Sequence, residues 1–279
     1  MDGVGLRCQA GPRPSGAVER WLSEAGDTMA VRRSPTTGRA VGMATYVLVP
    51  GADGAGWYWH LVLPELRAAG HDAVSLDLPM HDAADLDDVA DAIAEAATGA
   101  LAAARSAGRE GGPLVLVAQS LAGFSAPLVC TRLPVDRLIL VNAMVPRPGE
   151  TAGEWWDATG QPAARAARAE ADGRRGPDAQ FDLRTDFFHD VPAAVTDEAF
   201  AAQPGPPPSG VFAQPWPLAS WPDVPTRFLQ GRDDRFFPLE FQRRVVRERL
   251  GLDVEEVPGG HLGALSRPRE LARALTGPA

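Results

Sequence analysis

The sequence predicts an α/β protein with a mostly parallel central sheet and helices on both faces of that sheet. Short runs rich in Val, Leu and Ile recur along the chain, and a segment with helical spacing follows most of them. These runs are apolar throughout rather than alternating, which is typical of strands buried on both faces. Turn residues such as Pro50-Gly51 and Gly70 separate the two kinds of segment.

The expected strands and helices alternate from residue 44 onwards. Strands are expected at residues 45–49, 73–77, 113–118, 137–141, 226–230 and 252–257. Helices are expected at residues 56–69, 85–107, 121–133, 239–250 and 268–275. Because strand–helix–strand units cross over with one hand, these strands should lie parallel in a single sheet.

Two stretches interrupt this alternation. Residues 1–42 are rich in Gly, Arg, Ser and Pro, and we interpret them as a poorly ordered extension with a short helix near residues 18–25. Residues 147–222, an insertion of about 75 residues rich in Trp and Phe, are interpreted as a lid. The α/β core would then comprise residues 43–146 and 223–279. Ligands of such folds bind at the carboxyl ends of the strands, so the lid should cover that edge.

The composition argues against several classes of function. With 36 acidic and 27 basic residues and a net charge of −9, the chain gives no support to a nucleic-acid or membrane partner. The sequence contains no Lys, so lysine Schiff-base chemistry is excluded. No run reaches the roughly 20 apolar residues that cross a bilayer, and 2 Cys are too few for a disulfide framework. We expect a cytoplasmic protein without a metal or organic cofactor.

The segment around Ser120 carries the first signal for chemistry. Ser120 lies between an expected strand and an expected helix, in the frame Ala118-Gln-Ser-Leu-Ala122. A sharp turn at this point exposes the serine Oγ and requires small flanking residues. The backbone N–H of Leu121 can then face a developing oxyanion. The alternative is a serine that only caps the helix.

A histidine after the last expected strand carries the second signal. In Val257-Pro-Gly-Gly-His-Leu-Gly263, glycines flank His261, and this setting suits a base that must reach Ser120 Oγ. The histidines at positions 60, 71, 81 and 189 lack such a setting. His189 falls in the lid, where it could contact substrate or be purely structural.

With these motifs the chain resembles the α/β-hydrolase superfamily from about residue 44 to its end. The usual nucleophile frame is Gly-x-Ser-x-Gly, and both glycines are Ala in this sequence. The run Gly54-Ala-Gly-Trp-Tyr-Trp59, and a possible start at Met43, are similar to the small-lid branch that includes plant methylesterases and hydroxynitrile lyases. The resemblance implies a Ser–Asp–His triad in that chain order.

The resemblance also implies the acid and the second oxyanion donor. Its Gly-x-x-Asp pattern after the strand at 226–230 selects Asp234 over its neighbour Asp233, and Asp234 would accept the Nδ1–H of the histidine. The backbone N–H of Ala52 would join that of Leu121 in an oxyanion hole. Taken alone, the segment around Asp234 could be a polar loop with arginine partners. The glycine-rich segment at 51–56 could likewise be a flexible turn.

The function that this resemblance implies is carboxylic ester hydrolysis, on a small apolar ester, through an acyl-enzyme intermediate. The expected substrate-binding residues lie in the lid: Trp155, Trp156, Phe188, His189 and Trp216. Packing of the lid on the sheet is the alternative for each. Other functions left open are a hydroxynitrile-lyase type, a biosynthetic thioesterase or cyclase, and a receptor-like member of the fold. The plant lyases rely on a lid lysine that this chain lacks. We expect a small-molecule partner and a monomer or homodimer.

Overall fold

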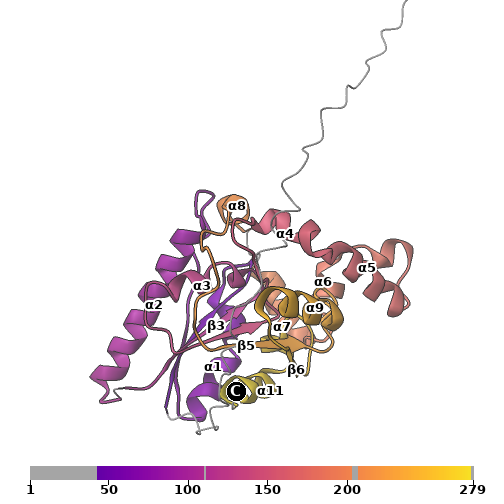
Figure 1. The fold of residues 1–279 in the computed structure, drawn as a ribbon. Coiled ribbons are helices and arrows are strands. Elements are labelled where there is room, and N and C mark those ends of the chain that lie inside the picture. Colours follow the sequence, from indigo (N-terminus) through magenta and orange to yellow (C-terminus); the bar gives the residue numbers. More distant parts are fainter. Residues whose placement is uncertain (1–42, 110, 203–206, 278–279) are drawn as a thin grey trace, which may run out of the picture. The chain divides into compact units, whose positions relative to one another are not determined.

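Six parallel strands form one sheet in the described part of the chain, and helices pack on both faces of that sheet (Figure 1). The structure, a computed structural model, describes residues 43–109, 111–202 and 207–277. The expected N-terminal extension, with its short helix, lies outside the described residues. Among the helices that are described, none is both long enough and apolar enough to cross a membrane.

The sheet has the strand order β2-β1-β3-β4-β5-β6. The bounds of the strands are β1 Thr45–Val49, β2 Asp72–Ser75, β3 Leu114–Gln119, β4 Arg137–Val141, β5 Thr226–Gly231 and β6 Glu255–Val257. The chain first moves outward from β1 to β2 and then returns to the other side of β1 with β3. The direction of winding therefore changes between β1 and β3, and ligands of open α/β sheets bind beyond the strand ends at such a point.

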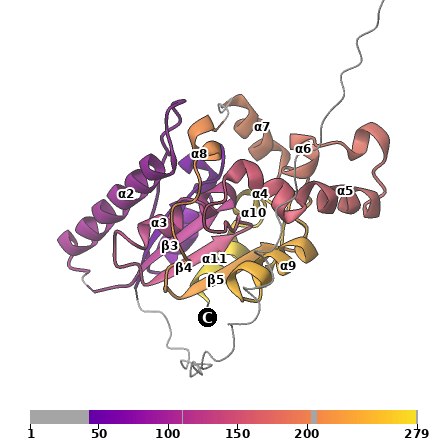
Figure 2. The ribbon, with the colours of Figure 1, turned by 45° about the horizontal axis from the view of Figure 1, so that its top comes forward.

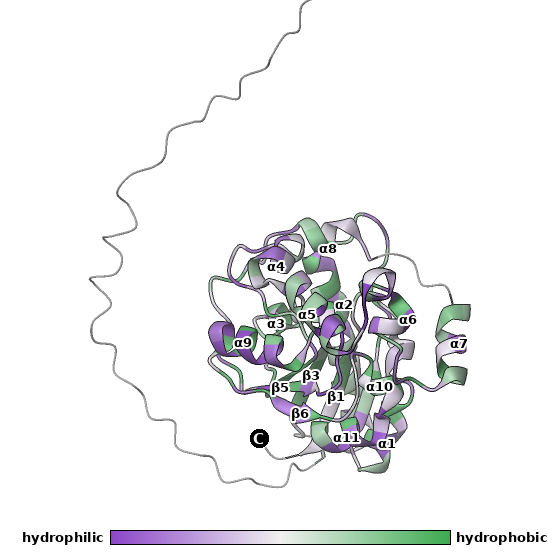
Figure 3. Ribbon diagram, turned by 90° about the vertical axis from the view of Figure 1, so that its right-hand side faces the viewer, coloured by the Kyte–Doolittle hydropathy of each residue, from purple (hydrophilic) through white to green (hydrophobic). Residues whose placement is uncertain are grey.

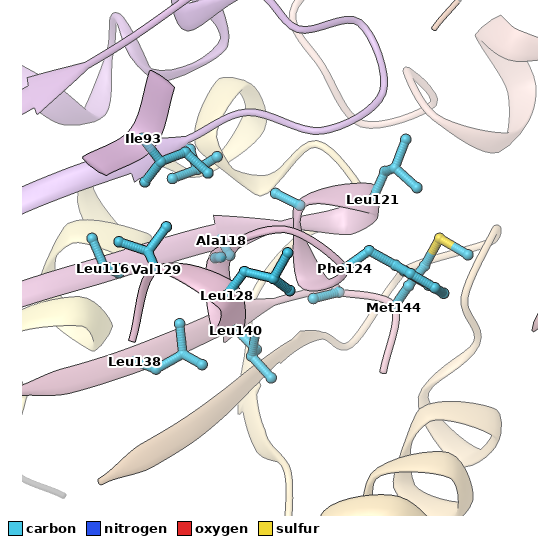
Figure 4. Packing of buried hydrophobic residues seen from close by; sticks show 14 of the residues in the cluster. Ile93, Leu116, Ala118, Leu121, Phe124, Leu128, Val129, Leu138, Leu140 and Met144 are labelled. Carbon is cyan, nitrogen blue, oxygen red and sulfur yellow. The ribbon is translucent and has the colours of Figure 1, made fainter. Parts of the chain in front are cut away.

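The apolar strands are buried on both faces because alternate side chains enter two separate cores. Along β3, Leu114, Leu116 and Ala118 pack into one core, and Val115 and Val117 into the other. Figure 4 shows part of the first core, where residues of β3 and β4 meet residues from the helices beside them. Burying a single aliphatic side chain contributes about 1.5–3 kcal/mol, so these two cores hold the sheet together.

Helices from the regular part of the fold cover the two faces. Their bounds are η1 Gly56–Trp59, α1 Val62–Ala68, α2 Leu86–Ser106, η2 Ser120–Gly123, α3 Ala126–Val129, α9 Leu239–Leu250, α10 Gly263–Ser266 and α11 Pro268–Thr276. Residues of α2, α3 and α9 line the first core, whereas residues of α1, α10 and α11 line the second. The start of α2 is fixed by a reciprocal capping box between Asp85 and Asp88.

Two of the expected helices are divided in the structure. The helix expected at 121–133 is replaced by η2 and the short α3. Pro127 has no backbone N–H to donate and is tolerated only in a first helical turn, so the helix starts anew just before it. The helix expected at 56–69 is likewise divided into η1 and α1.

Between β4 and β5 the chain forms helices instead of a strand, within the segment that the sequence marked as an insertion. They are α4 Ala152–Thr159, α5 Gln161–Ala171, η3 Gly176–Ala179, α6 Leu183–Asp186, α7 Ala193–Ala201 and α8 Ser209–Ala213. Figure 2 shows α4 to α8 grouped along one side of the sheet. In Figure 3, α7 and α8 are largely hydrophobic, whereas α9 of the core carries many hydrophilic residues. We call residues 147–222 the helical insertion.

Candidate active site

Ser120 sits in a strained turn at the carboxyl end of β3. Its φ angle is 52°, in the left-handed region that few residues other than glycine adopt. The flanking Ala118 and Ala122 are both buried. Glycine is strictly required one residue later, at position 123, because a Cβ there would lie 1.9 Å from the carbonyl oxygen of Met144. The turn therefore forms with alanine at both positions where the usual frame has glycine. Gly123 allows the backbone of the turn to approach the carbonyl group of Met144 closely.

The structure brings the three predicted triad residues into one hydrogen-bonded relay. Ser120 Oγ lies 3.1 Å from His261 Nε2, and His261 Nδ1 lies 2.8 Å from Asp234 Oδ2. A carboxylate can only accept, so Nδ1 carries the imidazole proton and Nε2 is free to accept the serine hydroxyl. The three side chains come from the ends of β3, β5 and β6, which are far apart in sequence.

Backbone amides orient the carboxylate of Asp234. Its Oδ1 accepts the N–H groups of Phe236 and Phe237, each at 2.8 Å, and its Oδ2 faces the imidazole. The side-chain amide of Gln230 adds a donor at 3.3 Å. A buried carboxylate is costly unless it is fully hydrogen-bonded, and these donors meet that need. The neighbouring Asp233 points elsewhere, toward the N–H of Gly259.

Three phenylalanine rings enclose the imidazole of His261, which is fully buried. The rings of Phe187, Phe236 and Phe237 lie with centroids 4.6, 5.4 and 5.1 Å from the imidazole, all in edge-to-face geometry. Phe187 belongs to the helical insertion, so both parts of the chain shield the relay. Excluding water in this way strengthens the electrostatic interactions inside the site.

Two backbone N–H groups beside Ser120 are available to an oxyanion. Ala52 and Leu121 both line the same cavity as the serine. Neither N–H group has an acceptor within the part of the chain that the structure describes. The loop after β1 approaches the serine closely because residue 51 is glycine: a Cβ there would lie 2.2 Å from Gln119 Oε1 and 3.0 Å from Ser120 Cβ.

The serine and histidine open on a cavity of about 860 Å³. Most of its wall is apolar, and its aromatic residues are Trp57, Tyr58, Trp156, Phe181, Phe187, Phe188, Phe200, Phe212 and Phe236. Asp53 is the one carboxylate among the described lining residues, and no arginine is among them. This volume and lining suit a small organic ligand that is largely apolar.

The residues expected to bind substrate fall into two groups. Trp156 and Phe188 line the cavity. Trp155 and Trp216 do not line it: both are buried in the first core, where their indole N–H groups donate to the carbonyl oxygens of Val145 and Phe124. The expectation that these two tryptophans bind substrate is therefore wrong. A large aromatic side chain in a helical insertion can pack against the sheet as well as line a cavity.

His189 also lies off the cavity wall, behind the loop that carries His261. A Cβ on Gly260 would lie 2.6 Å from its Cε1. Burial is the main reason that the pKa of His189 is lowered, although Asp190 opposes the shift. The Nδ1 atom of His189 is buried without a hydrogen-bond partner among the described residues.

Sequence reasoning missed several residues that the structure brings to the site. Tyr58 lines the cavity and accepts the N–H of Ala264 at 3.4 Å, and burial raises the pKa of its phenol. Asn142 follows β4 and contacts the histidine loop. For Asn142 the available signal was a polar residue directly after a buried strand. Tyr58 gave no signal beyond its place in the run Gly54–Trp59.

Comparison with known proteins agrees with this geometry. The model of the Alpha/beta hydrolase family matches residues 46–274, which is most of the chain. The chain belongs to the α/β-hydrolase family. A rice protein (Oryza sativa subsp. indica) named "Probable esterase PIR7A" is 27% identical over 265 residues, covering 82% of this chain and 94% of the rice protein.

Solved structures share the fold. A pyrethroid hydrolase from Sphingobium faniae JZ-2 has a TM-score of 0.60 at 24% identity, covering 84% of this chain and 96% of that one. A methylesterase from Arabidopsis has a TM-score of 0.60 at 18% identity, covering 84% and 97%. The resemblance to plant methylesterases, expected from the run Gly54–Trp59 and a possible start at Met43, is thus confirmed for the fold. In the part of this chain that the structure describes, no cluster of three or more His, Cys, Asp or Glu side chains could hold a metal ion.

Proposed function

We propose that this α/β-hydrolase hydrolyses carboxylic esters of small, apolar molecules through an acyl-enzyme on Ser120. The observation that carries the proposal is the relay of 3.1 and 2.8 Å from Ser120 through His261 to Asp234, opening on an aromatic cavity. The relatives support the same chemistry, since the rice protein is named an esterase. Residues 147–222 act as the lid that shapes the cavity.

The first half-reaction follows from the proton positions. His261 Nε2 takes the proton of Ser120 as Oγ attacks the ester carbonyl, and Asp234 stabilises the resulting imidazolium. The free N–H groups of Ala52 and Leu121 bind the oxyanion, a contribution typically worth about 2.7–4 kcal/mol for one donor. His261 then protonates the leaving alcohol, which leaves the acyl group on Ser120.

Water completes the cycle in the second half-reaction. His261 takes a proton from the water, the resulting hydroxide attacks the acyl carbonyl, and the tetrahedral intermediate collapses to release the acid. His261 returns its proton to Ser120 Oγ. Each proton taken by the imidazole is given back within one half-reaction, so the enzyme needs no external acid or base.

The lining of the cavity supports an uncharged, apolar acyl group. No arginine lies among the described lining residues to pair with an anion, and the exposed Asp53 would repel one. Each buried methylene contributes about 0.8 kcal/mol, so kcat/KM on p-nitrophenyl esters should rise about fourfold per methylene until the cavity is filled. An ester with a carboxylate at the end of its acyl chain should be a poor substrate.

Labelling with a fluorophosphonate tests the nucleophile. The wild-type protein should be labelled at Ser120, and Ser120→Ala should lose both the label and the esterase activity. Ser125→Ala is the matched control, because it removes another buried serine hydroxyl five residues along the chain, just before α3, and should keep the label. Labelling of folded protein at a residue other than Ser120, or no labelling at all, would refute the proposal. Release of cyanide from a cyanohydrin, with no ester hydrolysis, would replace it by the lyase function.

A further inference from the structure

Asn142 occupies the position in β4 that corresponds to Ser120 in β3. The last paired residues of these neighbouring strands are Gln119 and Val141, so the next residue of each strand lies at the same level of the sheet. Among the described residues, Ser120 and Asn142 are the two non-glycine residues with positive φ, at 52° and 46°. Such conformations persist only where the surroundings enforce them, and they cluster at functional sites.

The side chain of Asn142 joins the loops that carry the acid and the base. It is almost fully buried, at 1% exposure. Its Oδ1 accepts the N–H of Gly231, the last residue of β5 and three residues before Asp234, at 2.6 Å. Its Nδ2 donates to the carbonyl oxygens of Gly260 and His261 at 3.1 and 3.0 Å. The amide orientation is unambiguous, because turning it over would set a carbonyl against two carbonyls.

The backbone turn at Asn142 also supports the serine. Two residues later, the N–H of Met144 donates to the carbonyl oxygen of Ser120 at 2.9 Å. The carbonyl of Met144 in turn lies against Gly123, so closely that a Cβ there would clash. The left-handed conformation of Asn142 redirects the chain from β4 into this contact. The side chain of Asn142 thus contacts the acid loop and the base loop, and the chain that follows its turn contacts the nucleophile turn through Met144.

We propose that Asn142 is a positioning residue that sets the geometry of all three triad loops relative to one another. This inference rests on the proposed function, since it assigns Asn142 a role in the same relay. The alternative is that Asn142 only satisfies buried polar groups and so contributes stability alone. Its contacts are to the backbone of His261 itself, so their loss should misplace the imidazole. Misplacement of a reacting group by about 1 Å can cost about 100-fold in rate.

Two variants test the side-chain hydrogen bonds of Asn142 while the backbone conformation at this position is kept. Asn142→Gly allows the positive φ but removes all three side-chain hydrogen bonds. Asn142→Asp keeps an acceptor for Gly231 but offers no donor to the carbonyls of Gly260 and His261. For Asn142→Gly we expect kcat on p-nitrophenyl butyrate to fall about 10- to 100-fold, with KM changed less than about twofold. The rate of fluorophosphonate labelling should fall in parallel.

The pH profile distinguishes positioning from stability. A looser contact with Asp234 stabilises the imidazolium less, so the pH profile of kcat/KM for Asn142→Gly should differ from that of the wild type. Thr159→Val is the matched control, because it removes a buried hydroxyl that donates to Trp155, in α4 and away from the relay. This control should lose stability in thermal unfolding but keep the wild-type kcat and pH profile.

Several outcomes would overturn the inference. One is a kcat for Asn142→Gly within about twofold of wild type in folded protein. Another is a loss of activity that follows the folded fraction with an unchanged pH profile, as a purely structural role requires. If the wild-type protein itself fails to label at Ser120, the proposed function fails first and the role of Asn142 fails with it. Labelling of the wild type with unimpaired labelling of Asn142→Gly refutes the positioning role alone.

Discussion

The strand ends and the inner face of the helical insertion meet at the same cavity but are built differently. At the strand ends, polar side chains have partners in fixed directions: Asp234 accepts two backbone N–H groups in addition to the imidazole, and Asn142 makes three hydrogen bonds. The insertion contributes mainly phenylalanine and other apolar side chains to the wall, among them Phe187, Phe188 and Phe212.

This difference separates the chemistry from the recognition. Proton transfer needs donors and acceptors held within a fraction of an ångström, so a single substitution at the strand ends should lower kcat. Apolar contact is non-directional, so substitutions on the insertion should change KM and the preferred ester instead. The insertion is nevertheless tied to the strand ends, because Asp190 accepts the N–H of Gly260 at 2.8 Å and Arg235 donates to the carbonyl of Thr185 at 3.1 Å.

The largest effect is expected at the acid of the relay. Asp234→Asn cannot accept the Nδ1–H while its amide faces the imidazole, so the histidine loses the required tautomer and kcat should fall about 10⁴-fold. Asp233→Asn is the matched control, because Asp233 is a half-exposed neighbour outside the relay. Steady-state kinetics on one p-nitrophenyl ester measures kcat for both variants. A large loss in Asp233→Asn together with an active Asp234→Asn would reverse the assignment of the acid.

The nucleophile turn should be the next most sensitive point. In Gly123→Ala the new methyl group would meet the backbone carbonyl of Met144 at 1.9 Å, so the turn must shift. We expect at least a tenfold loss of kcat and a destabilisation of about 1–3 kcal/mol, the usual cost of overpacking. Gly99→Ala, in α2 with open space around it, should instead raise stability by about 0.5–1 kcal/mol. Equal behaviour of the two variants in urea unfolding and kinetics would contradict the steric account of the turn.

Two adjacent tryptophans test the division between core and cavity. Trp156 lines the cavity, so Trp156→Ala should raise KM for long-chain esters several-fold and leave acetate esters nearly unchanged. Trp155 is fully buried against Phe237 and Phe241, so Trp155→Ala should cost about 3–5 kcal/mol of stability. Chain-length profiles and urea unfolding of both variants provide the comparison. A shift in chain-length preference from Trp155→Ala, without loss of stability, would place the wrong tryptophan at the substrate.

Sequence analysis succeeded where local pattern and burial agree. The apolar runs that became β1, β3, β4 and β5 were predicted within about two residues, because strands buried on both faces leave a continuous apolar signature. Ser120 and His261 were predicted because each follows a strand, and parallel strands end at one edge of the sheet. Asp234 was selected through the resemblance to the α/β-hydrolase superfamily.

Two of the failures, at the tryptophans and at Asn142, have a different cause, which is packing between distant segments. Nothing within residues 147–222 distinguishes Trp155, which faces the sheet, from Trp156, which faces the cavity. The role that we propose for Asn142 depends on Gly231 and on the carbonyls at 260 and 261, all far away in sequence. The third failure is local: the helix at 121–133 was expected to be continuous, although Pro127 within it argues against that.

The smallest expected effect lies between the two regions, at His189 of the insertion behind the histidine loop. Its pKa is lowered, chiefly by burial, so the unfolded chain binds a proton at a higher pH than the folded protein does. Stability should therefore rise with pH through the range below about 6.5, and fall as acidification protonates the unfolded chain first. His189→Gln should flatten this dependence, by at most about 1.4 kcal/mol per pH unit for one proton.

Urea unfolding of wild type and His189→Gln between about pH 5 and pH 8 measures that difference. The comparison must be made against wild type rather than against a flat line, because burial also lowers the pKa of His71, which both proteins retain. Identical pH dependences would mean that the imidazole at 189 is as well solvated as in the unfolded chain. The contact behind the histidine loop would then be open to water, and the insertion would be joined to the strand ends less tightly than the bond from Gly260 to Asp190 indicates.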